Sequence, residues 1–273
     1  MKFTIKKSPL LALVIIFFTV APPDVSAEQL SYQGTHILAY STMGKLTDAY
    51  RQLAGVTVEV LGGGCSDGVV AITKGRAAMG GLCCPLKPEE VARNLVPHPV
   101  ARDIKVAVVN FINPLPGLSS QQLRDIHQGK ITNWKELGWI DRPIAVVYRK
   151  HCLDRREPVR VYLDLDDQLK NLAPKTIVVS TDIQLIDYVK RFPTAIGITS
   201  DVFVKNRGAE VNRLALDGVK PSATNVETGR YPFSAIMYIV TNGQPDPATR
   251  KFLDFAGSPA GRKIVRENLA TAP

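Results

Sequence analysis

The chain places its four cysteines at three separate turns: Cys65, the adjacent pair Cys83 and Cys84, and Cys152. Each follows a short apolar or β-branched run and precedes a loop or a helix-like segment. In α/β proteins, ligands bind at the junctions where a strand ends and a helix begins. A chain that uses cysteine only at such junctions is predicted to hold a ligand with its thiols.

Disulfide bonding is the alternative use of these residues. Four cysteines in an exported protein are typical of two disulfides. Adjacent cysteines such as Cys83 and Cys84 seldom bond to each other because the geometry is strained. A structural disulfide from Cys65 to one of them is the alternative.

The first 27 residues have the pattern of a secretory signal peptide. Lys2, Lys6 and Lys7 form a positive start, residues 10–20 are apolar, and residues 25–27 offer small side chains for cleavage. The apolar run is too short to span a bilayer comfortably. We therefore expect an exported mature chain that starts near Glu28.

The net charge of the chain is +9. Removing the predicted signal peptide, with its three lysines and one aspartate, leaves +7. A basic surface favours anionic ligands. No lysine- and arginine-rich run with interleaved aromatic residues is present, so nucleic acid is not expected as a partner.

Strand-like and helix-like segments alternate along the mature chain, and a turn is expected at residues 41–44. This order predicts a mainly parallel sheet with helices on both faces, in two α/β lobes with a cleft between them. Among the predicted strands are residues 36–40, 56–61, 77–82, 104–110, 144–148, 195–199, 211–216 and 231–241. Among the predicted helices are residues 45–53, 66–74, 88–94, 119–128, 182–191, 247–256 and 259–268.

Residues 118–137, which contain the stretch ITNW, are similar to a segment of the periplasmic phosphate-binding proteins of ABC transporters. Residues 75–90, 195–201 and 252–265 resemble further segments of that family, in the same order. The resemblance implies an α/β fold, that of a two-lobed type 2 periplasmic binding protein. It implies lobe I at residues 28–105 plus 205–273 and lobe II at residues 106–204. It also implies a monomeric, non-enzymatic protein of the periplasm that delivers a small inorganic ligand to an ABC permease or a membrane sensor.

The family's ligand contacts lie in four loops, and each loop matches a segment of this chain. In the fourth loop relatives usually carry a serine-glycine-threonine-arginine run, which is absent here, so that Arg155 or Arg156 would replace the usual arginine. The resemblance thus implies these ligand-binding residues: Ser41, Thr42, Met43, Gly64, Cys65, Ser66, Cys83, Cys84, His151, Cys152 and Arg155.

Cysteine occupies three of these four loops, where the family's ligand contacts are expected. If the loops converge, thiolates would select a soft metal ion or metalloid, held by Cys65, Cys83, Cys84 and Cys152. A cysteine at a helix N-terminus, as expected for Cys65, has a lowered pKa that favours such binding. A phosphate-like oxyanion is the alternative ligand. A thiol oxidoreductase using Cys83 and Cys84 is a further alternative, although no C-x-x-C motif is present.

Overall fold

The computed structural model describes residues 29–152, 154–205 and 211–273. The predicted signal peptide, residues 1–27, lies outside this range. No helix within the described range is both long enough and apolar enough to cross a bilayer.

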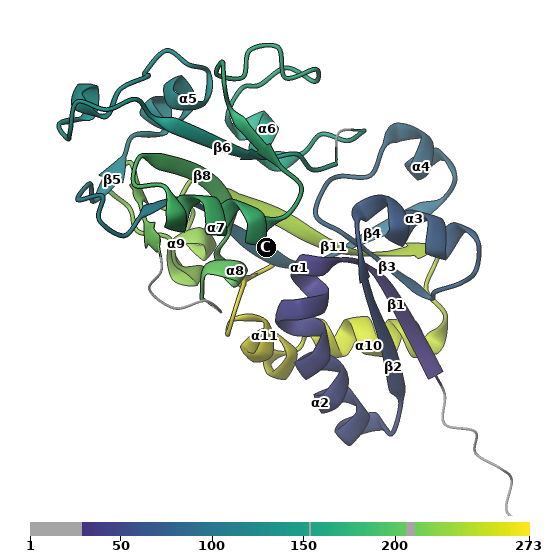
Figure 1. Cartoon of the computed structure of the whole chain (residues 1–273). Helices are drawn as coiled ribbons and strands as arrows, with labels where there is room; N and C mark the ends of the chain where they lie inside the picture. Colours follow the sequence, from purple (N-terminus) through teal and green to yellow (C-terminus); the bar gives the residue numbers. More distant parts are fainter. Residues whose placement is uncertain (1–28, 153, 206–210) are drawn as a thin grey trace, which may run out of the picture.

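Ten strands of the described residues form one curled sheet that runs through both halves of the molecule (Figure 1). The main path has the order β2-β1-β3-β11-β4-β8-β6-β7, and β9 and β12 also pair with β4. Pairing is parallel between β1, β2 and β3 and between β6, β7 and β8, and antiparallel wherever β4 or β11 takes part. The strands are β1 (Gln29–Thr35), β2 (Thr57–Gly63), β3 (Met79–Leu82), β4 (Leu95–Asn110), β6 (Ala145–Arg149), β7 (Ile177–Val179), β8 (Ala195–Ser200), β9 (Val211–Arg213), β11 (Ser234–Asn242) and β12 (Ala270–Thr271); β5 (Gly117–Leu118) and β10 (Ala215–Leu216) pair separately.

The long strand β4 connects two hydrophobic cores. Leu95 and Ala101 in its first part belong to one core, and residues 104 and 106–109 belong to the other. The first part pairs with β11 and the second with β8. The two cores correspond to two lobes that share this strand.

Helices cover the sheet of each lobe. In the first lobe α3 packs on β1 and β3, and α2 packs on β2 and against α10 and α11. In the second lobe α7 packs on β6 and β8, as Figure 1 shows. The helices are α1 (His36–Leu38), α2 (Gly44–Ala54), α3 (Cys65–Thr73), α4 (Pro88–Ala92), α5 (Ser120–His127), α6 (Pro158–Tyr162), α7 (Asp182–Arg191), α8 (Asp201–Lys205), α9 (Ala223–Glu227), α10 (Pro247–Gly257) and α11 (Pro259–Val265), with a π-helical turn at Ala39–Met43 and a 3-10 turn at Trp134–Leu137.

Side-chain caps fix where two predicted helices begin. The Thr181 hydroxyl accepts a hydrogen bond from the backbone N–H of Gln184, whose side chain accepts from the N–H of Thr181. Ser119 and Gln122 form the same reciprocal pair before α5. Such a capping box satisfies two N–H groups that the first turn leaves unpaired, and the helices predicted near residues 119–128 and 182–191 are confirmed.

The first strand was predicted in the wrong place. Residues 36–40 are helical, and the strand is β1, which ends at Thr35. Leu30 and Tyr32 point into the core at the alternating spacing of a strand, and β1 pairs with both β2 and β3. The turn expected at residues 41–44 is instead helical, so the strand-to-helix junction lies several residues earlier than expected.

The return of the chain to the first lobe also differs from the expected boundary. Val211, Leu216, Tyr231 and Phe233 belong to the core of the second lobe, although residues 205–273 were expected in lobe I. The first core includes Val202 before this stretch and Met237 after it, while Ala270 near the end of the chain packs in the second core.

Candidate metal centre

Three thiols and one imidazole converge between the lobes. Single ligand atoms of Cys65, Cys83, His151 and Cys152 all lie within 4.8 Å of one another. The Sγ atoms of Cys65 and Cys83 are 3.2 Å apart, and His151 Nε2 lies 3.2 Å from Cys83 Sγ and 3.1 Å from Cys152 Sγ. We call these four residues the thiol cluster. The structure holds all four cysteines of the chain as free thiols.

Two elements of the first lobe carry Cys65 and Cys83. Cys65 is the first residue of α3, whose start is fixed by the Asp67 carboxylate accepting a hydrogen bond from the N–H of Gly64 at 2.7 Å. Cys83 directly follows β3, and its own N–H donates to Cys65 Sγ at 3.1 Å. A backbone donor aimed at sulfur favours the thiolate form of Cys65.

Close backbone packing sets the distance between these two thiols. A Cβ atom built on Gly68 of α3 would lie 3.0 Å from backbone atoms of Gly81 in β3, and one on Gly80 would lie 2.8 Å from the Gly68 carbonyl oxygen. Only glycine lets the helix approach the strand this closely. The spacing of the two elements therefore depends on residues that carry no side chain.

The second lobe supplies His151 and Cys152, which follow β6. Cys152 has a backbone φ of +43°, a left-handed conformation that non-glycine residues seldom adopt. Strained backbone of this kind is concentrated at functional sites. Because each lobe gives two ligand atoms, the cluster is complete only when both lobes are in contact.

The electrostatics of the cluster favour thiolates beside an imidazolium. The pKa of Cys152 is lowered to about 6, mainly by its hydrogen bond with Cys65. For Cys65, the hydrogen bond with Cys152 raises the pKa, but those with Cys83 and Cys84 outweigh it and leave the pKa at about 6. Burial lowers the pKa of His151, and the hydrogen bonds to the cysteines overcome this effect and raise it to about 12. Thiols with lowered pKa values are ready to bind metal, and the His151 ring would release its proton when it becomes a ligand.

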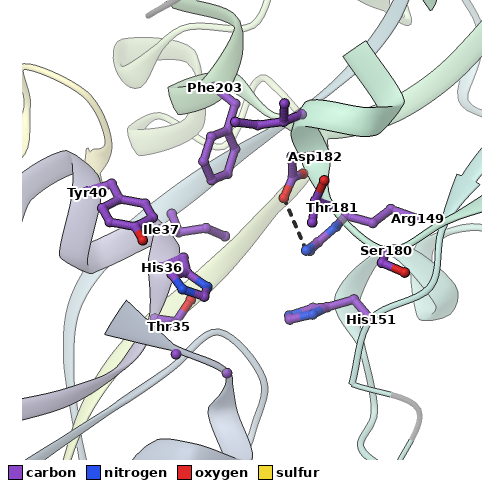
Figure 2. A pocket seen from close by; sticks show the side chains of 13 residues that line it. Thr35, His36, Ile37, Tyr40, Arg149, His151, Ser180, Thr181, Asp182 and Phe203 are labelled. Atoms are coloured by element: carbon purple, nitrogen blue, oxygen red, sulfur yellow. Dashed lines mark ion pairs between the residues drawn. The ribbon is translucent and has the colours of Figure 1, made fainter. Parts of the chain in front are cut away.

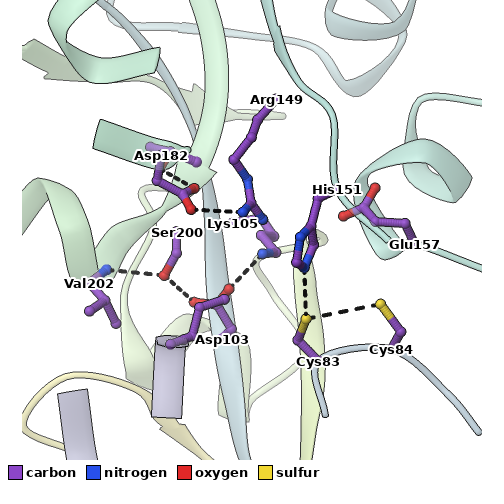
Figure 3. A network of polar contacts seen from close by, with 12 residues as sticks. Cys83, Cys84, Asp103, Lys105, Arg149, His151, Glu157, Asp182, Ser200 and Val202 are labelled. Atoms are coloured by element: carbon purple, nitrogen blue, oxygen red, sulfur yellow. Dashed lines mark hydrogen bonds and ion pairs between the residues drawn. The ribbon is translucent and has the colours of Figure 1, made fainter. Parts of the chain in front are cut away.

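Cys84 lies beside the cluster and outside its four convergent atoms. Its Sγ is 4.0 Å from Cys83 Sγ, and its side chain is fully buried. Hydrogen bonding to the other cysteines, with Cys152 first, raises the pKa of Cys84 and keeps it protonated. Cys84 is therefore not one of the four residues whose ligand atoms converge. Figure 3 shows Cys83 between Cys84 and His151, in contact with both.

The remaining residues expected at the site lie in other surroundings. Arg155 forms a buried ion pair with Glu90, and Ser66 Oγ donates to Asp154 at 3.4 Å.

Three residues of the expected first ligand loop are buried inside the π-helical turn, because β1 ends earlier than expected: Ser41, Thr42 and Met43. The Ser41 hydroxyl donates a hydrogen bond to the Ile37 carbonyl. Thr35, at the end of β1, occupies the strand-end position that was predicted for residues 41–43.

A cavity of about 430 Å³ opens next to the thiol cluster. It touches His151 and Gly64, so it reaches both the second-lobe ligand and the start of α3 (Figure 2). Arg149 and Asp182 form an ion pair at 3.1 Å in its wall, and Asp182 also accepts a hydrogen bond from Thr199. The cavity is lined by Thr35, His36, Ile37, Tyr40, Gly63, Gly64, Arg149, His151, Ser180, Thr181, Asp182, Ile183 and Phe203.

Arg149 and residues 180–182 were not predicted as site residues. Arg149 directly follows the predicted strand at residues 144–148, so the strand-end rule applied to the cysteines would have found it. Thr181 is the N-cap of a predicted helix, but the short strand β7 before it was not predicted. Without that strand the segment did not resemble a strand-to-helix junction.

A second buried network lies next to the Arg149–Asp182 pair, on strand β4, which the two lobes share (Figure 3). Lys105 and Asp103, neighbours along β4, form an ion pair at 2.7 Å, and the Ser200 hydroxyl donates to the other oxygen of Asp103. Burial lowers the pKa of Lys105, but the Asp103 carboxylate outweighs it and the pKa is raised. The pairing satisfies charges that would be costly to bury alone.

Comparison with known proteins assigns the chain to a class. Residues 28–260 match the family model described as the PBP superfamily domain, so the chain belongs to the PBP superfamily, in agreement with the family resemblance and the two-lobed fold. Phosphate-binding protein PstS of Bacillus subtilis is 31% identical over 222 residues, covering 76% of this chain and 68% of the relative.

Two solved structures share the fold over most of the chain. A Clostridium perfringens protein solved with bound phosphate has a TM-score of 0.76 and 26% identity, covering 90% of this chain and 100% of its own. An ABC-type phosphate transport receptor from Vibrio cholerae has a TM-score of 0.71 and 26% identity, with the same coverage.

Proposed function

We propose that this chain is an exported, non-enzymatic solute-binding protein that captures a soft metal ion or metalloid between its lobes. The ligand would be held by Cys65, Cys83, Cys152 and His151 and passed to an ABC permease or a membrane sensor. The convergence of these four donors within 4.8 Å is the observation that carries the proposal. The solved structures of a phosphate ABC transporter substrate-binding protein and of a phosphate transport receptor support the transport role.

The donor set suits a soft ion. Three thiolates and one imidazole form one of the usual tetrahedral zinc sites, with Zn–S distances of about 2.3 Å. Sulfur atoms at that distance and a tetrahedral angle are about 3.8 Å apart. The Cys65 and Cys83 sulfurs, at 3.2 Å, would need to separate by only about half an ångström. Thiolate ligands select soft ions over magnesium or calcium.

A phosphate-like oxyanion is the second candidate. The relatives' names and the bound phosphate in the C. perfringens structure favour it. In this chain, however, the Asp182 carboxylate lies beside the cavity arginine Arg149 and would repel a simple anion. The serine-glycine-threonine-arginine run that the family resemblance leads us to expect in the fourth loop is also absent, and each lost hydrogen bond to a charged ligand costs about 1.5–3 kcal/mol. These observations favour the soft ion.

Ligand binding by the mature protein tests the proposal. The protein is purified without oxygen, and elements bound to it are measured before and after titration with Cd(II) or Zn(II). The proposal predicts one tightly bound soft ion per chain and weak or no phosphate binding by calorimetry. Tight phosphate binding that survives serine substitution of all four cysteines would establish the oxyanion function instead.

A further inference from the structure

The cavity beside the thiol cluster is larger than a bare ion requires. Its volume of about 430 Å³ equals that of roughly fourteen water molecules at ~30 Å³ each. Four protein donors are enough for a tetrahedral ion, and zinc can expand to a fifth ligand. A ligand consisting of the ion alone would therefore leave this cavity unused, although it has the size of a small-molecule site.

The wall of the cavity offers opposite charges side by side. The Arg149 and Asp182 side chains are only 13% and 6% exposed, and Asp182 is held in place by the Thr199 hydroxyl at 2.8 Å. Asp182 contacts the Nη1 group of Arg149. A guanidinium carries five N–H donors, so Arg149 has further donors with which to bind a ligand. The start of α7 contributes Thr181 and Ser180 to the same wall and adds the positive end of a helix dipole.

The opposite wall is aromatic and apolar. The rings of His36 and Tyr40 stack with centroids 5.1 Å apart, and Phe203 and Ile37 complete this side (Figure 2). His151 links the two sites, because it lines the cavity and belongs to the thiol cluster. A molecule in the cavity can therefore lie next to the ion-binding position.

We propose that the cavity binds an α-amino acid with a metal-binding side chain, which enters together with the soft ion. Its carboxylate would pair with Arg149 and the start of α7, and its ammonium group with Asp182. Its side chain would lie between the aromatic wall and His151, toward the ion. An ion pair in the wall is complementary to a zwitterion, whereas a simple anion would meet the Asp182 charge. This inference rests on the proposed function and names the co-ligand of the same ion.

The test uses the full mature chain loaded with one equivalent of Zn(II) in buffer free of amino acids. Zinc affinity measured at this stage tests the proposed function by itself. L-Histidine, D-histidine and phosphate are then titrated by calorimetry, and gel filtration with element analysis verifies that zinc stays bound. We expect L-histidine to bind at least about 10-fold more tightly than D-histidine, because the two chelate zinc equally but only one can place its carboxylate, ammonium group and ring at the three positions in the cavity together.

Two substitutions assign the binding to the cavity. Asp182→Asn and Arg149→Gln should each weaken L-histidine binding roughly 10-fold or more while zinc affinity changes little, because each removes a charge-assisted hydrogen bond. Asp141→Asn, an exposed site with 69% of its side chain accessible, is the matched control and should change neither affinity.

Three results would overturn the inference. One is no L-histidine binding to zinc-loaded wild-type protein at about 10 mM. Another is D-histidine or phosphate binding as tightly as L-histidine, and the third is unchanged L-histidine affinity in folded Asp182→Asn protein. The comparison of ligands on the wild-type chain decides the question even if both variants fail to fold.

Discussion

The Arg155 guanidinium forms two hydrogen bonds to the Glu90 carboxylate, at 2.6 and 2.8 Å, although the residues are 65 positions apart. Glu90 lies in α4 between two strands of the first lobe, and Arg155 follows the second-lobe segment that carries His151 and Cys152. Both side chains are buried. The pair therefore fastens the second-lobe half of the thiol cluster to the first lobe.

Glu90→Gln should destabilise the protein strongly. Removing one partner of a buried ion pair leaves an uncompensated charge and costs about 3–5 kcal/mol. The free energy of unfolding, measured with urea on the metal-free protein, checks this. Asp154→Asn is the control: it breaks the Lys87–Asp154 pair, in which the aspartate is half exposed, and should cost less than about 1 kcal/mol. Equal losses in the two variants would contradict the prediction.

Cys83→Ser should weaken Cd(II) binding roughly 100-fold or more. Structural zinc sites bind with about 10–16 kcal/mol in total, so one of four ligands accounts for about 3 kcal/mol. Competition with a coloured chelator measures the affinity. Cys84→Ser is the matched control, because the Cys84 sulfur lies outside the four convergent atoms. If Cys84→Ser lost as much affinity as Cys83→Ser, the ligand assignment would be wrong.

Gly68→Ala should reduce both stability and metal affinity. The new Cβ would lie 3.0 Å from backbone atoms of Gly81, so α3 would have to move away from β3 and carry Cys65 with it. Overpacking of this kind costs about 1–3 kcal/mol. Gly44→Ala in α2 meets nothing within 4 Å and should be neutral or slightly stabilising. Thermal unfolding and Cd(II) titration of both variants test this, and unchanged Cd(II) affinity in Gly68→Ala would refute the link between helix packing and the site.

Protonation of the buried His127 should lower the free energy of unfolding in mild acid. Burial lowers the pKa of His127 to about 4, while the unfolded chain has its ordinary value near 6.5. Between these values the unfolded state binds the extra proton, so stability present above pH ~6.5 is lost as the pH falls toward 4, by up to about 3 kcal/mol. His127→Asn should flatten this part of the stability curve in urea unfolding. A curve of the same slope in the variant would show that other groups cause the loss.

Local sequence patterns correctly predicted that Cys65 and Cys83 lie at the ends of strands. Cys65 and Cys83 lie at strand-to-helix or strand-to-loop junctions because glycine runs, capping residues and short apolar segments mark those boundaries within a few residues. The convergence of the loops followed from the family resemblance. The distances that exclude Cys84 and include His151 depend on side-chain packing, which no local pattern contains.

Other features depend on distant parts of the chain. Pro97 and Pro99 disfavour a central strand, yet β4 includes both because it pairs with β11 over its first part. The ion pairs of Arg149 with Asp182 and of Arg155 with Glu90 join residues that nothing in the sequence connects. As a result, Arg155 was expected to contact the ligand, whereas the structure pairs it with a carboxylate.

X-ray absorption spectroscopy of the metal-loaded mature protein tests the central claim most directly. Zn(II) or Cd(II) bound at one equivalent should show three sulfur neighbours and one nitrogen neighbour, with Zn–S distances of about 2.3 Å. Serine at position 65, 83 or 152 should remove one sulfur. A first shell made only of oxygen and nitrogen, or a protein that retains no soft ion, would contradict the account.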